Sequence, residues 1–454
     1  MNADLFYETY SETAVSLYLI SKSQWEEAIE PLSSFELNCF NTQQFKGKLG
    51  DCCLINHPNG TLHKAYIGVG EGTAEQALAH AALTLPPGSY QVTSILSHNA
   101  ALHWALAQYK FDAYKHKTVK PRLLVVKSED LKDILPLAQA IFLVRDLINT
   151  PANAMGPKDL ALVLEHVAKT FEGQFQQWVG DDLLKHNFPA VHAVGRASTS
   201  APRMLSLSYG DASHPRITLI GKGVCFDSGG LDIKLNSTMR LMKKDMGGAA
   251  HVIGLAQWIM AKRLPVRLEV LIPAVENALG PNAFRPGDVL TMRNGLTVEI
   301  DNTDAEGRLI LADALSKACE DSPELIIDFS TLTGAARIAV GTDIAALFTN
   351  SDALAADLMD ASQKTQDAVW RLPLFAAYKD QLKSYIADMT NCGTTSYGGA
   401  IVAALFLQQF ISKSIPWVHF DVMAWNLSSK PGKPEGGEAL GFRTVAEYLL
   451  RRYG

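Results

Sequence analysis

The chain has 454 residues, of which 47% are hydrophobic and 19% are charged, and its formal net charge is −6. This length exceeds what one ordinary core takes and predicts two domains, and the composition is typical of a soluble globular protein. The mild acidity argues against a dedicated nucleic-acid or membrane-surface protein, since both need a basic face.

Six cysteines are scattered along the chain without a CxxC pair. This spacing argues against a disulfide framework or a thiolate zinc site and favours reduced thiols in a cytosolic protein. The first residues, MNADLFYETYSE, lack a basic region followed by an apolar run, so we expect no signal peptide. No apolar run reaches the length of a membrane span, and we expect a cytoplasmic protein without a membrane partner.

The first 145 residues hold short mixed elements and form the first predicted domain. AEQALAHAALTL is typical of a helix and PRLLVVK of a strand. The stretch YKFDAYKHKTVKPR between them is locally basic; a solvated surface is the favoured interpretation, and a nucleic-acid patch is the alternative. Residues 129–148 predict a long linker helix with a break or kink at Pro136. NTPAN ends this helix, and we place the domain boundary between residues 145 and 146.

Residues 146–454 alternate between buried apolar strands and helices, which predicts an α/β domain with a largely parallel sheet. The predicted strands are ITLIGKG, VRLEVLIPAVE, ELIIDFSTLTG and WVHFDVMAW, and the predicted helices are GGAAHVIGLAQWIMAKRL, ILADALSKACE and GGAIVAALFLQQF. Sites in such sheets gather at the carboxyl ends of the strands. Acidic residues follow the strands ITLIGKG and TVEI, and STLTG ends the strand ELIIDF.

Four carboxylates need an explanation: Asp227, Asp245, Asp304 and Glu306. Each could be a loop cap or a surface charge, and for Asp245 alone a helix cap would be favoured. If the loops converge, the carboxylates raise one another's pKa, so either some are protonated or cations lie among them. If the segment around Asp304 is extended, Asp304 and Glu306 face the same way, because side chains two apart share a face of a strand.

Two lysines, Lys222 and Lys234, flank Asp227. Lys222 is either a salt-bridge partner of the acids or a metal ligand, and a ligating lysine must be neutral, which a nearby divalent cation favours. The GxxxxGK[ST] spacing of a phosphate loop is absent. Ser228 in DSGG is a weak candidate nucleophile, because the GxSxG elbow is absent and no histidine is marked as its base.

The segment NTDAEGRL, residues 302–309, resembles the signature of the leucine aminopeptidase (cytosol aminopeptidase) family of two-metal exopeptidases. GKGVCFDSGGLDIK, MKKDMGGAAHV, RDLINTPAN, STLTGA and HFDV also match the family in order and spacing. The resemblance is good from residue 145 onward and looser before it. It implies a smaller N-terminal α/β domain joined by a linker helix to a larger C-terminal α/β domain with a mixed, largely parallel sheet.

The resemblance also assigns roles to individual residues. It implies that the tighter metal ion is bound by Lys222, Asp227, Asp245 and Glu306. It implies that the second, more exchangeable ion is bound by Asp227, Asp304 and Glu306. By the same resemblance Lys234 stabilises the oxyanion, and Arg308 holds a bicarbonate ion that accepts the proton of the attacking water. The implied substrate-binding residues are Met242, Asn302, Thr331 and Gly334.

Three positions depart from the family's usual residues. Cys225 and Asp232 stand where threonine and serine are common, and Asp232 adds a negative charge two residues from Lys234. Asp232 either faces away or tunes that lysine or an amino-terminal contact. Met423 stands where a small residue is common, and a pocket-lining role and ordinary core packing are equally favoured. These departures leave the substrate preference open.

The predicted function is a metal-dependent aminopeptidase that releases N-terminal residues by two-metal activation of water. Leucine and other apolar residues are the expected preferred N-terminal residues. An oxygen-rich ligand set suits zinc or manganese, with magnesium or cobalt as alternatives. The family resemblance implies a homohexamer acting on peptides. One alternative is DNA binding through the lysine-rich stretch 110–127, but the net charge argues against it. The other alternative is a two-metal phosphoesterase, but the lysine ligand and the absence of histidine ligands argue against it.

Overall fold

The computed structural model describes residues 2–115 and 120–454, and the chain forms two compact units. The first comprises residues up to 142 together with 427–435, and the second comprises 143–426 and 436–454. Helix α5 (Ser128–Asn149) is the predicted long helix, and it continues through Pro136 without the expected break. The proline removes one backbone donor, but the other turns of the helix remain bonded. The boundary between residues 145 and 146 stays a prediction.

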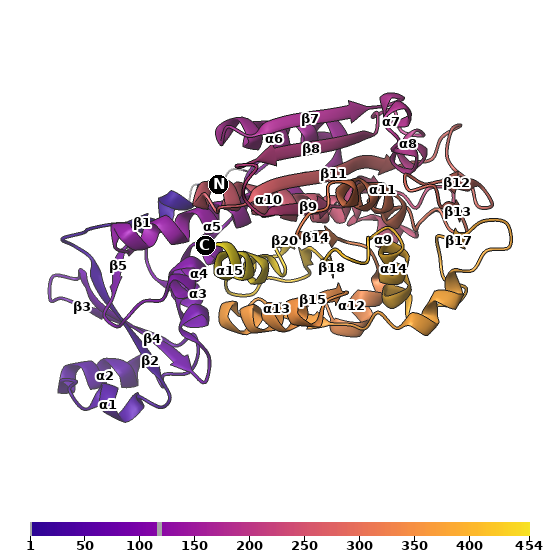
Figure 1. Ribbon diagram of the computed structural model, residues 1–454. Helices are drawn as coiled ribbons and strands as arrows, with labels where there is room; N and C mark the ends of the chain where they lie inside the picture. Colours follow the sequence, from indigo (N-terminus) through magenta and orange to yellow (C-terminus); the bar gives the residue numbers. More distant parts are fainter. Residues whose placement is uncertain (1, 116–119) are drawn as a thin grey trace. The chain divides into compact units, whose positions relative to one another are not determined.

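The first unit is built on a six-stranded sheet in the order β1-β6-β5-β2-β4-β3, in which only β3 and β4 pair antiparallel. The strands are β1 (Tyr7–Glu8), β2 (Val15–Ser21), β3 (Cys52–Asn56), β4 (Leu62–Gly70), β5 (Gly88–Val92) and β6 (Arg122–Val125). The helices are η1 (Ala3–Phe6), α1 (Trp25–Ile29), α2 (Ser34–Thr42), α3 (Ala74–Thr84) and α4 (His98–Gln108). The predicted helix AEQALAHAALTL is α3, which packs against α4 (Figure 1), and the predicted strand PRLLVVK is β6.

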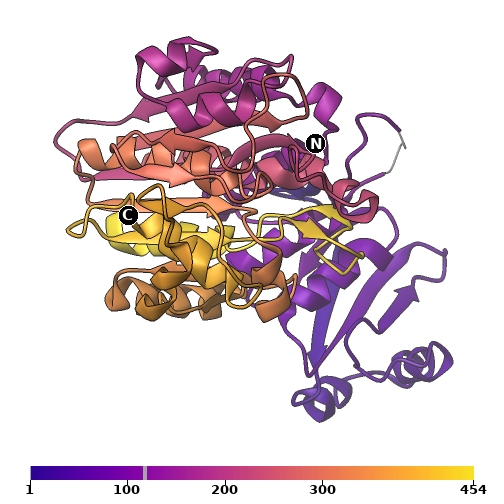
Figure 2. The ribbon, with the colours of Figure 1, turned by 90° about the vertical axis from the view of Figure 1, so that its right-hand side faces the viewer.

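The second unit contains a nine-stranded sheet in the order β16-β15-β18-β14-β9-β11-β8-β7, with β10 also paired to β11. Figure 2 shows this stack with the magenta strands β7 and β8 toward the top and the orange segment of β15 and β16 toward the bottom. The pairs β18–β14, β14–β9, β9–β11, β11–β10 and β15–β16 are parallel, and the pairs that involve β8 and the pair β15–β18 are antiparallel. The predicted mixed, largely parallel α/β architecture is therefore confirmed.

The strands of this sheet are β7 (Gln174–Val179), β8 (Arg203–Tyr209), β9 (Arg216–Gly221), β10 (Gly223–Asp227), β11 (Arg267–Asn277), β14 (Leu325–Ser330), β15 (Ala345–Thr349), β16 (Val369–Arg371) and β18 (Trp417–Asp421). Strands β19 (Trp425–Asn426) and β20 (Gly436–Gly437) form a separate pair. The long strand β11 pairs with β9 along its first half and with β10 along its second half. This arrangement carries the chain from the centre of the sheet to Asp227.

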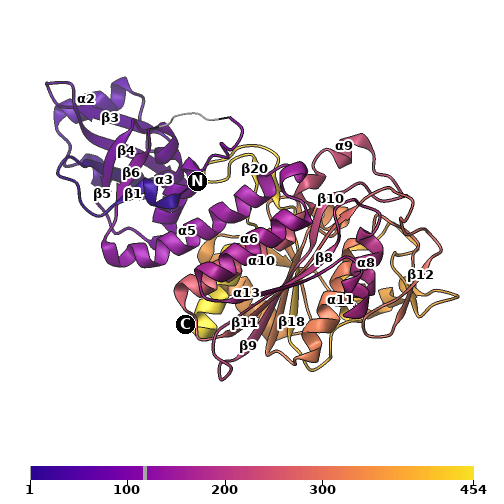
Figure 3. The ribbon, with the colours of Figure 1, turned by 90° about the horizontal axis from the view of Figure 1, so that it is seen from above.

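Helices cover both faces of the sheet. Helix α10 (Gly247–Lys262) packs on β9, β11 and β14, and α11 (Gly307–Glu320) packs with α8 (Pro189–Gly195) on the opposite face (Figure 3). Helix α10 is buried nearly all round, which its almost unbroken apolar sequence requires. The other helices of this unit are η2 (Ala152–Ala154), α6 (Pro157–Thr170), α7 (Asp182–Lys185), α9 (Asn236–Met239), η3 (Met242–Met246), α12 (Gly334–Val340), α13 (Asp352–Thr365), η4 (Ala376–Leu382), α14 (Gly399–Gln408) and α15 (Phe442–Tyr453).

The strand before the NTDAEGR segment lies outside the large sheet. TVEI forms β13 (Thr297–Glu299) in a three-stranded sheet with β12 (Val289–Thr291) and β17 (Met389–Thr390). The expectation that this segment leaves the carboxyl end of a large-sheet strand is therefore wrong. β13 is short and only its central residue is fully buried, so it lacks the apolar surface that a central strand needs.

Candidate functional site

A cavity of about 360 Å³ lies where β10 and β14 end and where η3 leads into α10. Ten of the eleven predicted site residues line it, and Glu306 lies directly behind them, 3.0 Å from Lys222. The ten are Lys222, Asp227, Lys234, Met242, Asp245, Asn302, Asp304, Arg308, Thr331 and Gly334. A larger hollow of about 900 Å³ in the first unit contains none of them.

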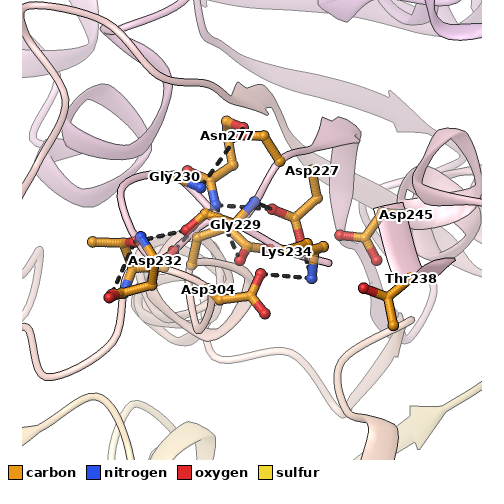
Figure 4. A network of polar contacts seen from close by, with 12 residues as sticks. Asp227, Gly229, Gly230, Asp232, Lys234, Thr238, Asp245, Asn277 and Asp304 are labelled. Carbon is orange, nitrogen blue, oxygen red and sulfur yellow. Dashed lines mark hydrogen bonds and ion pairs between the residues drawn. The ribbon is translucent and has the colours of Figure 1, made fainter. Parts of the chain in front are cut away.

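Three buried carboxylates converge at the bottom of this cavity. Asp227, Asp245 and Glu306 are 2%, 2% and 1% exposed, and one oxygen of each lies within 4.8 Å of the others. Figure 4 shows Asp227 and Asp245 facing the same space beside Lys234. Charges this close cannot all be retained in a buried site without positive partners.

The two predicted lysines supply part of this positive charge. Lys222 Nζ lies 2.7 Å from Asp245 Oδ2 and 3.0 Å from Glu306 Oε1. Lys234 Nζ lies 2.9 Å from Asp227 Oδ2 and 2.5 Å from Asp304 Oδ1 (Figure 4). The side chain of Lys222 passes against Gly307, where a β-carbon would come within 2.5 Å of its Cε. A side chain at the start of α11 would therefore displace Lys222 from its position beside the carboxylates.

The lysines do not balance the acidic charge. Burial, and next the charge of Asp227, raise the pKa of Glu306 to about 8 and the pKa of Asp304 to about 6. Burial lowers the pKa of Lys222, but Asp245, Glu306 and Asp227 outweigh it and raise that pKa above its ordinary value. The carboxylates alone therefore keep Lys222 protonated, and a neutral, ligating Lys222 requires a further cation.

The donor set fits divalent metal ions. Asp245 Oδ2, Asp304 Oδ1 and Glu306 Oε1 are buried and meet ammonium groups, but they accept no well-directed hydrogen bond from the residues that the structure describes. Buried carboxylate oxygens of this kind are ligands for zinc, manganese or magnesium. Lys222, Asp227, Asp245 and Glu306 could hold one ion, and Asp304 is linked to Asp227 through Lys234, which contacts both carboxylates.

The NTDAEGR segment is a tight turn and not an extended strand. Asn302 Oδ1 accepts from Asp304 N at 2.7 Å, and Asn302 O accepts from Ala305 N at 3.2 Å. Glu306 has helical dihedrals, φ −75° and ψ −34°, at the start of α11. The expectation that Asp304 and Glu306 share a strand face is therefore wrong; the turn sends them to different lysines. Asparagine favours such a turn because its side chain bonds the backbone two residues on.

Asp232 faces away from Lys234. Its Oδ2 accepts from Thr303 N at 2.8 Å and from Thr303 Oγ1 at 3.1 Å, and its own N–H donates to Thr303 Oγ1 at 2.9 Å. Of the two interpretations of this departure, the structure supports the one in which Asp232 points away from Lys234, and Asp232 holds the turn that carries Asp304 (Figure 4). Cys225 is fully buried on β10 and does not line the cavity.

Sequence reasoning missed Asn277 and Asn391. Asn277 Nδ2 donates to Asp227 Oδ1 at 2.9 Å, to Thr303 O at 3.1 Å and to Glu306 Oε2 at 3.5 Å, so one amide orients two of the clustered carboxylates. Asn391 bonds both sides of the turn, at Asn302 O and Ala305 O, 2.7 and 3.3 Å away. A polar residue ending the apolar strand β11 was the available signal for Asn277. No local pattern marks Asn391.

The remaining predicted residues occupy the wall of the cavity. Thr331 Oγ1 donates to Asp245 Oδ1 at 2.7 Å, and Arg308 Nη1 donates to Asn391 O at 2.8 Å. Arg308 is 8% exposed, and burial lowers its pKa. Met423 is 6% exposed and is not among the lining residues, which favours core packing.

Ser228 is engaged in loop hydrogen bonds. Its Oγ donates to Asn277 O at 2.7 Å and accepts from Gly230 N at 3.2 Å. No histidine is among the described residues that line the cavity, so the structure offers no base for a serine nucleophile there.

Two other expectations concern partners. The lysine-rich stretch 110–127 includes residues 116–119, which lie outside the described residues. Among the helices that the structure describes, none combines the length and the apolar character of a membrane span.

Comparisons with known proteins agree with this geometry. The model of the cytosol aminopeptidase family catalytic domain matches residues 142–446, and that of the M17 aminopeptidase N-terminal domain matches residues 15–126. A probable cytosol aminopeptidase of Aquifex aeolicus is 34% identical over 90% of this chain and 89% of its own. One from Sulfurihydrogenibium sp. is 38% identical over 76% of this chain and 72% of its own.

Two solved structures are similar over nearly the whole chain. The cytosol aminopeptidase from Coxiella burnetii has a TM-score of 0.96 and 45% identity, covering 99% of this chain and 100% of its own. The bottromycin maturation enzyme BotP in complex with Mn has a TM-score of 0.88 and 31% identity, covering 97% and 100%. The catalytic-domain model spans more than half of the chain, and the Aquifex relative is matched over most of both lengths. This chain is thus a member of the cytosol aminopeptidase family, whose enzymes are metal-dependent peptide hydrolases.

Proposed function

We propose that this metal-dependent aminopeptidase uses two divalent metal ions to hydrolyse the first peptide bond of its substrates. The observation that carries the proposal is the convergence of Asp227, Asp245 and Glu306 in one buried cluster, with two lysines and Asp304 beside it. Lys222, Asp227, Asp245 and Glu306 would hold the tighter ion. Asp227, Asp304 and Glu306 would hold the second, so that Asp227 and Glu306 belong to both proposed ligand sets. Zinc or manganese is the proposed metal, with magnesium or cobalt as alternatives.

Two bound ions of this kind supply Lewis acidity, which polarises a carbonyl and lowers the pKa of a water molecule. The residues around them have separate tasks. Thr331 and Asn277 orient the carboxylates through their hydrogen bonds. Lys234 provides a positive charge for the developing oxyanion, and Arg308, buried at the cavity wall, would hold a bicarbonate ion as the base.

The substrate would enter with its free α-amine toward the acidic cluster, since an acylated amine has lost the basic lone pair that such a site attracts. Met242, Asn302, Thr331 and Gly334 line the cavity and are the proposed contacts for the substrate. Met242 is 7% exposed and offers an apolar surface, which supports acceptance of leucine and other apolar first residues.

By resemblance to its family we also propose a cytoplasmic homohexamer, and cell fractionation would test the location.

The test is hydrolysis of leucine p-nitroanilide by chelator-stripped protein, with and without added Mn²⁺ or Zn²⁺. We expect metal-restored cleavage of the free-amine substrate and none of the N-acetylated one. Glu306→Ala should lose at least a hundredfold in rate and should bind less metal by elemental analysis, because second-shell changes alone cost 10–100-fold in such sites. Glu320→Ala, an exposed change on the same helix, is the matched control.

Absence of cleavage under every metal, repeated with other N-terminal residues, would overturn the proposed activity. Equal cleavage of the acetylated substrate would overturn the role of the free amine. Full activity of Glu306→Ala with unchanged metal content would overturn the proposed ligand set.

A further inference from the structure

Three cationic side chains in the cavity, Lys244, Arg308 and Arg337, have no acidic partner among the described residues, and Arg308 is already the proposed site for bicarbonate. Lys222 and Lys234 form ion pairs with the clustered carboxylates, whereas Lys244 and Arg337 line the same cavity and form no ion pair with any residue in the described parts of the chain. Lys244 is buried and Arg337 is half-buried. An unpaired cation removed from water is costly, and such a group is often retained where it meets a ligand of opposite charge.

Lys244 is the more buried of the two. It is 2% exposed, lies two residues from Met242 on η3, and its ammonium has no hydrogen-bond partner among the described residues. The acids closest to it are engaged elsewhere. Asp245 is bonded to Lys222 and Thr331. Asp421 accepts from the backbone of Leu332 and from Thr333.

Arg337 reaches the cavity from α12. Its Nη2 lies beside Gly334, 3.3 Å from where a β-carbon of that glycine would stand, and its Nη1 donates to the weak acceptor Met423 Sδ at 3.3 Å. The charges of Lys244 and Arg337 are close enough for Arg337 to lower the pKa of Lys244, after the larger effect of burial. Both cations line the same cavity as Met242 and Gly334.

We propose that Lys244 and Arg337 bind the side-chain carboxylate of an N-terminal glutamate or aspartate, so that acidic first residues are substrates in addition to apolar ones. This inference rests on the proposed aminopeptidase function and on Met242 and Gly334 contacting the first residue. A carboxylate would give both cations charge-assisted hydrogen bonds that the protein itself does not provide. An N-terminal lysine would be repelled by the same pair.

The carboxylate could also come from the free C-terminus of a short peptide, and the substrates are chosen to separate the two sources. Amino-acid p-nitroanilides have no C-terminal carboxylate, so any charge effect among them belongs to the side chain. Comparing the cleavage rates of Leu-Gly and Leu-Gly-amide measures the effect of the C-terminal carboxylate.

The experiment compares kcat/KM for the Leu, Glu, Gln and Lys p-nitroanilides with metal-loaded full-length protein. Glutamine has the shape of glutamate without its charge, so the Glu/Gln ratio isolates the effect of the two cations. We expect a Glu/Gln ratio of kcat/KM of at least about ten, because one charge-assisted hydrogen bond contributes about that factor. We also expect poor cleavage of the Lys substrate. Lys244→Met and Arg337→Met should each lower the ratio severalfold, and the double variant should bring it to about one.

Arg240→Met removes a cation from an exposed position of the same segment and should leave the ratio unchanged. Cleavage of the Leu substrate shows whether each variant is folded. Arg337→Glu provides an independent readout, because it should shift the preference toward the Lys substrate even if Lys244→Met does not fold.

A wild-type Glu/Gln ratio of one or less, with the Leu substrate cleaved, would overturn this inference and leave the aminopeptidase function intact. An unchanged ratio in folded Lys244 and Arg337 variants would also overturn it. A preference for Leu-Gly over its amide that is lost in the variants, without a Glu/Gln effect, would assign the cations to the peptide C-terminus instead. Loss of cleavage of every substrate would be a failure of the proposed function itself.

Discussion

At the scale of single residues, several side chains in the cavity act by holding others. Asp232 bonds the backbone of Thr303, and Asn277 donates to Asp227 and Thr303 O, so both fix the turn between Asn302 and Glu306. Residues that orient metal ligands in this way affect metal affinity nearly as strongly as the ligands themselves. Asp232 therefore has a defined structural task.

Asp232→Ala should weaken metal binding by about 10–100-fold while leaving the protein folded, because it frees Thr303 N from its acceptor. Metal titration followed by activity, together with a melting curve of the metal-free protein, measures both effects. The matched control is Asp211→Ala, which removes a similar carboxylate that caps the exposed turn at Ser213. Equal metal affinity in Asp232→Ala and wild type would contradict this role.

At the scale of elements, the central strands β14 and β18 are joined by a buried side-chain pair. His419 Nδ1 lies 2.6 Å from Asp328 Oδ1, and Trp417 Nε1 donates to Asp328 Oδ2 at 2.6 Å. These strands end at Ser330 and Asp421 and so carry the cavity wall around Thr331. The pairing links the stability of the sheet to the position of the site.

Burial lowers the pKa of His419, but Asp328 outweighs it and the pKa is raised. The folded state therefore favours the protonated histidine. The stability that this contributes is full below pH 6.5 and is lost as pH rises through the raised pKa. His419→Gln should cost about 3–5 kcal/mol where the histidine is charged, and less at higher pH. Melting temperatures of wild type and variant across pH 6 to 9 measure this difference.

The matched control for this prediction is His251→Gln. His251 is also fully buried, but its pKa is lowered, chiefly by burial. The contribution of His251 to stability should therefore decrease as pH falls, whereas that of His419 decreases as pH rises. A difference between wild type and His419→Gln that grows with pH would show that the pair is not held in the charged form.

At the scale of the whole molecule, the second unit exposes large apolar side chains that a monomer would leave in water. Tyr385 and Ile338 are 106% and 90% exposed, and Tyr397 is 82% exposed. Exposed apolar side chains of this size are frequent in protein–protein interfaces, and they support the proposed homohexamer.

Sedimentation velocity at micromolar concentration should therefore give one main species with the mass of six 49.4-kDa chains. Apolar burial between chains would drive this assembly. Tyr385→Glu should shift the protein toward smaller species, whereas Tyr10→Glu, at an exposed site in the first unit, should not. A stable monomer with full aminopeptidase activity would contradict the proposed assembly.

Much of this protein could be predicted before its structure was described. The alternation of apolar strands and helices predicted the α/β class, because burial on both faces of a parallel sheet leaves a continuous apolar pattern. The NTDAEGRL, GKGVCFDSGG and MKKDMGG segments indicated which carboxylates and lysines meet, since local segments of this length carry their own turn and ligand residues. All eleven predicted residues lie in or directly behind one cavity.

Other features depend on segments that are far apart in the chain. The turn at Asp304 is held by Asn391. The acids near Lys244 accept hydrogen bonds from distant segments: Asp245 from Thr331, 86 positions away, and Asp421 from Leu332, 89 positions away. Local spacing carries no record of such pairings. Whether Asp232 faces Lys234 or Thr303, and whether Lys244 has a partner, follows from how the loops pack, because a side chain's electrostatic environment is set by its neighbours in space.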